Sequence, residues 1–335
     1  MKNRIRSIII LAITCVLLYL VFRKVGLADL FNTLRQADPL WIVVSLAITP
    51  LLILVSVVRW QALLKSQGVR LSIARLYGLY LVGRFFNYFL PSNVGGDVVR
   101  GYELGTQTKD GARAMASVFM ERFTGFIMLV AFAVVSSITN YRLLQNTGLE
   151  PAVLMAVIIL IGILWLILDV RPLNLVARWI SFPFAQKYIK KIKKFHASIY
   201  AYKGEWRVLT VALLWSFVFM VLAIANVYAS AMAFHKPVSL PEIIVVVPVI
   251  LVVAMFPLTV NGLGLQEWAY VLLFNWIGLP SSVGLSTILL IRSKDIVLSL
   301  IGGLIYAYMR VQKREAVPDI PRSEEVFEDH SQETV

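Results

Sequence analysis

The chain has 335 residues, of which 59% are hydrophobic and only 15% charged, and its mean hydropathy is +0.78. A soluble domain is nearer half apolar and a quarter charged, so this composition excludes an ordinary soluble protein and predicts an all-α polytopic membrane protein. The formal net charge of +13 is concentrated in segments beside apolar runs, which accounts for it without nucleic-acid binding. A lone cysteine, Cys15, excludes a disulfide within the chain and a cysteine metal cluster.

Six apolar runs are long enough to cross a hydrocarbon core of about 30 Å as helices. In chain order they are residues 5–22, 40–58, 114–139, 152–170, 208–234 and 284–309. The first has a basic start but no small-residue cleavage site after it, so we expect an uncleaved transmembrane helix. Two further runs, 75–104 and 242–279, are interrupted by proline and glycine, and hydropathy counts them as spans too, eight in all.

Lysine and arginine near the helix ends predict the orientation, because cytoplasmic segments carry the excess of both. Four segments are rich in them: the N-terminus, the stretch from Arg59 to Arg75, residues 171–207, and 310–314. We assign these to the cytoplasm, which places both termini there and predicts a cell (inner) membrane protein. Residues 140–151, 235–241 and 279–283 are poor in base and are assigned to the outside.

With these assignments each interrupted run begins and ends on one side of the membrane. Residues 75–104 start and finish inside, whereas 242–279 start and finish outside. Both are therefore predicted to be re-entrant helical hairpins beside the six full spans. The alternative is that they cross completely, which gives a plain helical bundle.

The two halves of the chain then have the same order of elements in opposite orientations, which is an inverted-topology repeat. We expect a first repeat over 1–140, a second over 149–310, and an acidic, disordered cytoplasmic tail over 311–335. The interruptions support this pairing, because LPSNVGGD (90–97) and FPLTVNGLGLQE (256–267) both combine proline, small polar residues, glycine and an acid.

The interruptions also predict irregular backbone at membrane depth, which is tolerated where protein or a water-filled cavity satisfies its polar groups. Proline removes a backbone donor and glycine permits a tight reversal. The predicted hairpin backbone residues are Pro91, Gly95 and Gly96 in the first hairpin and Pro257, Asn261, Gly262 and Gly264 in the second. A helix that starts near Asp97 would turn its free N–H groups toward the interior, where they suit an anion. Asp97 is also an ordinary helix cap.

Charged side chains in the apolar runs indicate a site, because a charge at the bilayer centre costs about 3 kcal/mol on insertion scales. The predicted headgroup residues are Arg84, Asn87, Ser92, Asp97, Arg100, Glu121, Arg122, Glu267, Arg292 and Asp295. In one interpretation the arginines attract phosphate, while the carboxylates balance them and couple protons. In the other, the same residues form a neutralised network that only holds the hairpins. The histidines do not cluster, so we expect no metal site, and without a Walker motif we expect no cofactor.

Four stretches resemble the lysylphosphatidylglycerol-synthase-type transmembrane family, which is related to the N-terminal membrane region of the bacterial multiple peptide resistance factor. They are RWQALL (59–64), GRFFNYFLPSNVGGDVVRGYEL (83–104), ERFTG (121–125) and PLTVNGLGLQEWAYVLLF (257–274). The resemblance covers about residues 5–310. It implies a flippase-like unit that moves aminoacylated phospholipid between leaflets, here without the soluble domain that makes the lipid.

Together these features favour a lipid flippase or scramblase-like transporter. Its expected partners are membrane lipids with an anionic or aminoacylated headgroup, or a polyprenyl-phosphate, and no nucleic acid. Two alternatives remain. One is a membrane glycosyltransferase acting on polyprenyl-phosphate, for which the external loops are short, and the other is an assembly partner that transports nothing.

Overall fold

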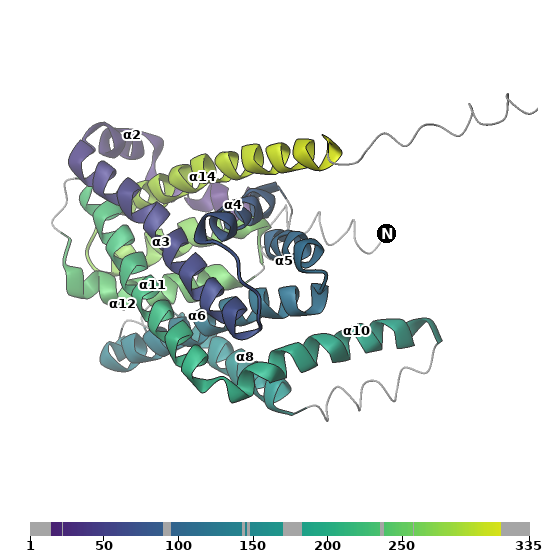
Figure 1. Cartoon of the computed structure of the whole chain (residues 1–335). Helices are drawn as coiled ribbons and strands as arrows, with labels where there is room; N and C mark the ends of the chain where they lie inside the picture. The colour runs from purple at the N-terminus through teal and green to yellow at the C-terminus, as the bar shows by residue number, and fades with distance from the viewer. Residues whose placement is uncertain are drawn as a thin grey trace, which may run out of the picture.

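The computed structural model of the protein describes residues 15–21, 23–89, 95–142, 145, 148–169, 183–234, 238–256 and 258–315. Within these residues the regular secondary structure is entirely helical, as the composition predicts (Figure 1). Three of the predicted site or hairpin residues, Pro91, Ser92 and Pro257, lie outside the described residues.

The helices follow one another in a bundle, with α14 along one side and α10 along another (Figure 1). In chain order the α-helices are α2 (Leu27–Arg35), α3 (Pro39–Ser66), α4 (Ile73–Phe89), α5 (Gly95–Thr108), α6 (Gly111–Thr139), α8 (Glu150–Leu168), α10 (Pro183–Tyr200), α11 (Trp206–Met232), α12 (Leu240–Met255), α13 (Leu265–Trp276) and α14 (Ser281–Glu315). Short 3₁₀ turns lie at Ala201–Gly204 and Val260–Gly262.

Four of the described helices, α3, α6, α8 and α11, are long and apolar enough to cross a membrane. Their ends lie where sequence rules place them: Asp38 precedes Pro39 at the start of α3, and its carboxylate accepts a hydrogen bond from the backbone N–H of Leu40 at 2.9 Å. Asp110 caps α6 in the same way. The protein is therefore a multi-pass, membrane-embedded helical protein.

Helix α14 has 35 residues and corresponds to the predicted run 284–309. Its apolar sequence is interrupted by Arg292, Lys294 and Asp295. These three charged residues lie within one helical turn near the middle of the helix. It packs mainly against α4 and α13. It also extends to Glu315, so the first residues of the predicted tail are helical.

The two interrupted runs form two pairs of short helices, α4 with α5 and α12 with α13. These helices have 17, 14, 16 and 12 residues. At 1.5 Å per residue they measure between about 18 and 26 Å, so each is shorter than a hydrocarbon core of about 30 Å. The reversal before α13 uses Asn261, Gly262 and Gly264, all with positive φ.

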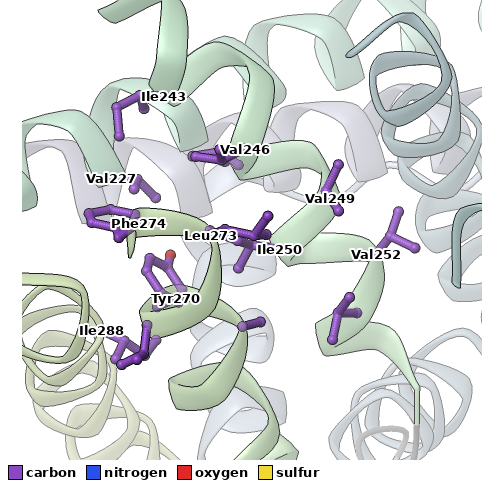
Figure 2. Packing of buried hydrophobic residues seen from close by; sticks show 14 of the residues in the cluster. Val227, Ile243, Val246, Val249, Ile250, Val252, Tyr270, Leu273, Phe274 and Ile288 are labelled. Atoms are coloured by element: carbon purple, nitrogen blue, oxygen red, sulfur yellow. The ribbon is translucent and has the colours of Figure 1, made fainter. Parts of the chain in front are cut away.

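The largest apolar core surrounds α12, which is hydrophobic on every side and is buried as such helices are. Figure 2 shows its side chains Ile243, Val246, Val249, Ile250 and Val252 packed with neighbouring helices. The partners drawn there are Tyr270, Leu273 and Phe274 of α13, Val227 of α11 and Ile288 of α14. This core fixes the second short pair against the long spans.

Glycine allows the first short pair to pack without side chains between the helices. A Cβ atom on Gly96 of α5 would lie 1.8 Å from the carbonyl oxygen of Gly83 on α4. On the other face of α4, a Cβ atom on Gly302 of α14 would lie 2.0 Å from the carbonyl oxygen of Leu81. Helix α4 is thus held between two backbones at van der Waals contact.

We predict that Gly96→Ala forces α4 and α5 apart and destabilises the protein by about 1–3 kcal/mol, the usual cost of overpacking. Thermal unfolding in detergent measures this. The matched control is Gly162→Ala in α8, where a Cβ atom meets nothing within 4 Å. This control should be neutral or stabilising by up to about 1 kcal/mol. Equal effects of the two substitutions would contradict the close packing.

Candidate functional site

A polar cavity of about 270 Å³ lies where the two short helix pairs approach the long helices. Both pairs contribute to its wall, α4 through Arg84, Asn87 and Tyr88 and the second pair through Asn261 and Gln266. Arg122 of α6 and Arg292 and Asp295 of α14 complete its charged lining. Most of the predicted headgroup residues therefore surround or support one space.

An apolar groove of about 700 Å³ adjoins this cavity. Its walls come from α5, α6, α8, α10 and α12, and its apolar lining includes Val118, Phe119, Phe123, Phe126, Ile159, Ile163 and Met255. Asn87, Arg122, Asn261 and Gln266 line both spaces. A molecule with a polar end and an apolar chain would therefore meet both kinds of surface at once.

Glu121 of α6 is the centre of the first charge network, with a side chain that is 0% exposed. One carboxylate oxygen pairs with Arg59 of α3, and the other accepts a hydrogen bond from Nη2 of Arg100 of α5 at 2.9 Å. Arg59 also donates to Oγ of Ser216 on α11 at 2.8 Å. Gly125 leaves room for the Arg59 guanidinium, since a Cβ atom there would lie 3.1 Å from its Nη1. Glu121 thus joins three helices.

Arg100 is buried between two aromatic rings. Its guanidinium carbon lies 4.5 Å from the ring centroids of Trp60 and of Tyr80, which suits a cation–π contact on each side. It also approaches Asp97 at 3.2 Å, the i,i+3 pair that the sequence allows. With 1% of its side chain exposed, Arg100 supports the site without lining the cavity.

Arg122 is the accessible arginine of this network. Its Nε and Nη2 donate to the two carboxylate oxygens of Asp97 at 2.8 and 3.0 Å, so the pair is bidentate. Even so, 48% of its side chain is exposed, and it lines both the cavity and the groove. Its Nε also lies 3.9 Å from a carboxylate oxygen of its buried neighbour Glu121. Asn87, which also lines both spaces, accepts a hydrogen bond from the backbone N–H of Gly96 at 2.7 Å.

The second network is built around Arg292 of α14. It forms an ion pair with Glu267 and donates to the backbone carbonyls of Gly262 and Asn261 at 3.1 and 3.4 Å. Glu267 in turn accepts a hydrogen bond from the N–H of Gly264 at 2.7 Å. Arg292 therefore donates to backbone carbonyls of the irregular segment in front of α13, as buried backbone groups without helical partners require.

Asp295 completes the link between the two short pairs. The spacing of Arg292 and Asp295 permits a local pair, but Asp295 instead binds Arg84 of α4. The charged turn of α14 thus contacts α13 through Arg292 and α4 through Asp295. Both Arg84 and Asp295 keep 26% of their side chains exposed, toward the polar cavity that they line.

One sequence-based assignment was wrong. Arg59 was placed in a cytoplasmic loop, whereas α3 continues to Ser66 and buries Arg59 at 3% exposure. The sequence also missed the aromatic rings of Trp60 and Tyr80 and the amide of Gln266. An arginine directly after an apolar run is normally assigned to a cytoplasmic segment by the positive-inside rule. The only signal in the sequence that Arg59 is buried is its helical spacing from apolar residues of the preceding run. Within the described residues no group of three potential ligands could hold a metal ion.

We predict that Glu121→Gln destabilises the protein by about 3–5 kcal/mol, because it leaves the buried guanidinium of Arg59 without a carboxylate and that of Arg100 with Asp97 alone. The control is Asp110→Asn, at a pair between Asp110 and the exposed Lys194 with an N–O distance of 3.2 Å. Asparagine keeps the helix cap, so the loss there should be below about 1 kcal/mol. Thermal unfolding of both variants in detergent compares them, and similar shifts would contradict the central role of Glu121.

Comparison with known proteins places the chain in a family. Residues 7–303 match the family described as the lysylphosphatidylglycerol synthase TM region. A UPF0104 membrane protein of Methanocaldococcus jannaschii is 24% identical over 331 residues, which cover 94% of this chain and 98% of the relative. Another, from Methanothermobacter thermautotrophicus, is 23% identical over 296 residues, or 83% of this chain and 88% of the relative.

No solved structure matches the chain at a significant level. These relatives are described only as membrane proteins. Because the family match extends over most of its length, the chain belongs to the lysylphosphatidylglycerol synthase transmembrane-region family.

Proposed function

We propose that this protein transfers a lipid with an anionic, phosphate-bearing headgroup between the two leaflets of the cell membrane. The observation that supports this is the polar cavity that adjoins an apolar groove, with four lining residues in common. The cavity would hold the headgroup, and the groove would hold an acyl or polyprenyl chain. A charged cavity inside a membrane protein is costly, which favours a functional role over a purely structural one.

The charge of the site favours an anion. The two networks contain five arginines, Arg59, Arg84, Arg100, Arg122 and Arg292, against four carboxylates, Asp97, Glu121, Glu267 and Asp295. Arg122 is the most exposed of these arginines. Its planar guanidinium can bind a phosphate with two hydrogen bonds, as it now binds Asp97. A phosphate would compete with Asp97 for this group, while Asp97 keeps its contact with Arg100.

The two short helix pairs would act as re-entrant hairpins whose tips meet at the cavity. Parallel contacts support an inverted repeat over 1–140 and 149–310. Arg122 of α6 binds Asp97 in the first turn of α5, and Arg292 of α14 binds Glu267 in the first turn of α13. The two arginines both follow their acids by 25 residues. The excess of basic residues in the assigned loops supports cytoplasmic termini.

For the hairpins we predict slow labelling of Asn261→Cys by membrane-impermeant maleimides from either side, in a Cys15→Ser background. A re-entrant tip faces the interior cavity, whereas two full spans would bring residue 261 to the cytoplasmic surface. Lys109→Cys and Gly278→Cys, in turns at the ends of α5 and α13, serve as accessible controls. Labelling of residue 261 from the cytoplasm as fast as residue 109 would contradict the hairpin.

For transport we predict that Arg122→Gln slows leaflet exchange of fluorescent phosphatidylglycerol in reconstituted vesicles by roughly 10- to 100-fold. This corresponds to the loss of a charge-assisted hydrogen bond, about 1.5–3 kcal/mol. The fold should persist, because Asp97 still contacts Arg100. Exchange is followed by the fraction of fluorescence that dithionite quenches from outside.

The matched control is Arg113→Gln on the same helix. Arg113 also pairs with an aspartate, Asp110 at 3.5 Å, and has a similarly exposed side chain at 54%, but it lines neither space. This variant should exchange lipid at the wild-type rate. An unchanged rate in Arg122→Gln would exclude Arg122 from the headgroup site, and an inactive wild-type protein would exclude lipid transfer.

A further inference from the structure

Lys294 is a buried lysine in the charged turn of α14, with 3% of its surface exposed. Its ammonium nitrogen donates to the amide oxygen of Asn226 at 2.8 Å, to the hydroxyl of Ser230 at 3.1 Å and to the backbone carbonyl of Ser45 at 3.3 Å. All three acceptors are uncharged, and two helices, α3 and α11, supply them. Lys294 lines neither the cavity nor the groove.

The elements around this part of α14 leave Lys294 without a free carboxylate. The helices that pack against α14 carry ionisable residues that include Asp29 and Arg35 of α2, Arg59 and Lys65 of α3, Arg84 and Tyr88 of α4, Arg207 and Tyr228 of α11, and Glu267 and Tyr270 of α13, and α14 itself carries Arg292 and Asp295 beside Lys294. Asp295 acts on Lys294 electrostatically but is bound to Arg84, and Glu267 is bound to Arg292. Among the described contacts neither charged residue of α2 touches Lys294. A buried ammonium without its own counter-ion is costly to maintain.

The carboxylates of the charged interior already have cationic partners. Asp97, Glu121, Glu267 and Asp295 each form an ion pair with at least one arginine, whereas the ammonium of Lys294 donates to uncharged acceptors. Arginine itself stays charged in proteins, whereas a buried lysine exchanges its proton readily. Lys294 is therefore the group of this charged interior that is suited to gain and lose a proton.

We propose that Lys294 is a proton-binding site and that the proton bound there accompanies the anionic headgroup across the membrane. This rests on the proposed lipid transfer. The five arginines and four carboxylates of the two charge networks have a net charge of +1. The ammonium of Lys294 raises this net charge to +2. An anion in the cavity beside Arg292 and Asp295 therefore binds better when Lys294 is protonated, and by linkage the headgroup promotes proton uptake.

The first experiment measures protons directly. Short-chain phosphatidylglycerol is added to the purified protein in weakly buffered detergent containing a pH indicator, at a series of pH values from neutral to alkaline, so that the series includes conditions in which Lys294 of the free protein is unprotonated. Wild-type protein should take up as much as about one proton per chain as the lipid binds, and phosphatidylcholine should cause no uptake. Bound phosphatidylglycerol without proton uptake would overturn the proposal, and failure of the lipid to bind would overturn the headgroup site as well.

Two variants fix the charge of the Lys294 surroundings in different ways. Lys294→Met removes the titrating amine, and Asn226→Asp places a carboxylate against the ammonium with almost no change in shape. Both should abolish proton uptake, and Asn226→Asp does so while preserving the packing around Lys294. The control Lys65→Met removes an exposed lysine at the end of α3 and should leave uptake unchanged. Undiminished uptake in both Lys294→Met and Asn226→Asp would assign the proton elsewhere.

The second experiment tests coupling in vesicles with a pH step of about one unit. Fluorescent phosphatidylglycerol should accumulate in the leaflet that faces the alkaline side, up to about tenfold for one proton per lipid. Lys294→Met and Asn226→Asp should still exchange lipid but distribute it equally. An equal distribution with wild-type protein would overturn proton coupling and leave lipid transfer intact. An absence of exchange would overturn the proposed function, and proton uptake would then be decided by the first experiment alone.

Discussion

The rest of the structure depends on the ion pairs that the buried carboxylate of Glu121 forms with two arginines. The carboxylate neutralises Arg59 and Arg100, two guanidinium groups from separate helices that have almost no exposure. Without that carboxylate, Arg59 would lose its described ion-pair partner and Arg100 would keep only Asp97, and a buried unpaired charge is expensive. Through Arg100 the same carboxylate also positions α5, the second helix of the first short pair, against α3 and α6.

A second constraint concerns the irregular backbone. The backbone between two short helices leaves N–H and carbonyl groups without helical partners, and where it is buried these groups need other partners. In the second short pair Arg292 and Glu267 provide these partners for Asn261, Gly262 and Gly264. Some of the charged side chains therefore hydrogen-bond to the irregular backbone. Arg292 does so and also lines the polar cavity.

The turn of α14 from Arg292 to Asp295 connects these constraints. Successive side chains on a helix point in different directions, so three charges within four residues reach different partners. Arg292 contacts α13, Lys294 contacts α3 and α11, and Asp295 contacts α4. A change of charge or position in this single turn would therefore alter contacts with both short helix pairs and with the two long helices α3 and α11.

The sequence by itself determined the membrane class, the four long apolar helices α3, α6, α8 and α11, and the position of both interruptions, because hydropathy, proline and glycine are local properties. It also selected most of the charged interior, since a charge within an apolar run is visible without a structure. Only the tertiary structure decided the partners of these charges. Arg84 binds Asp295, which lies 211 residues later in the chain, and Arg59, which the sequence placed in a loop, binds Glu121 from within a helix. Ion pairing depends on distance in space, and that distance is set by how the helices pack rather than by their order in the chain.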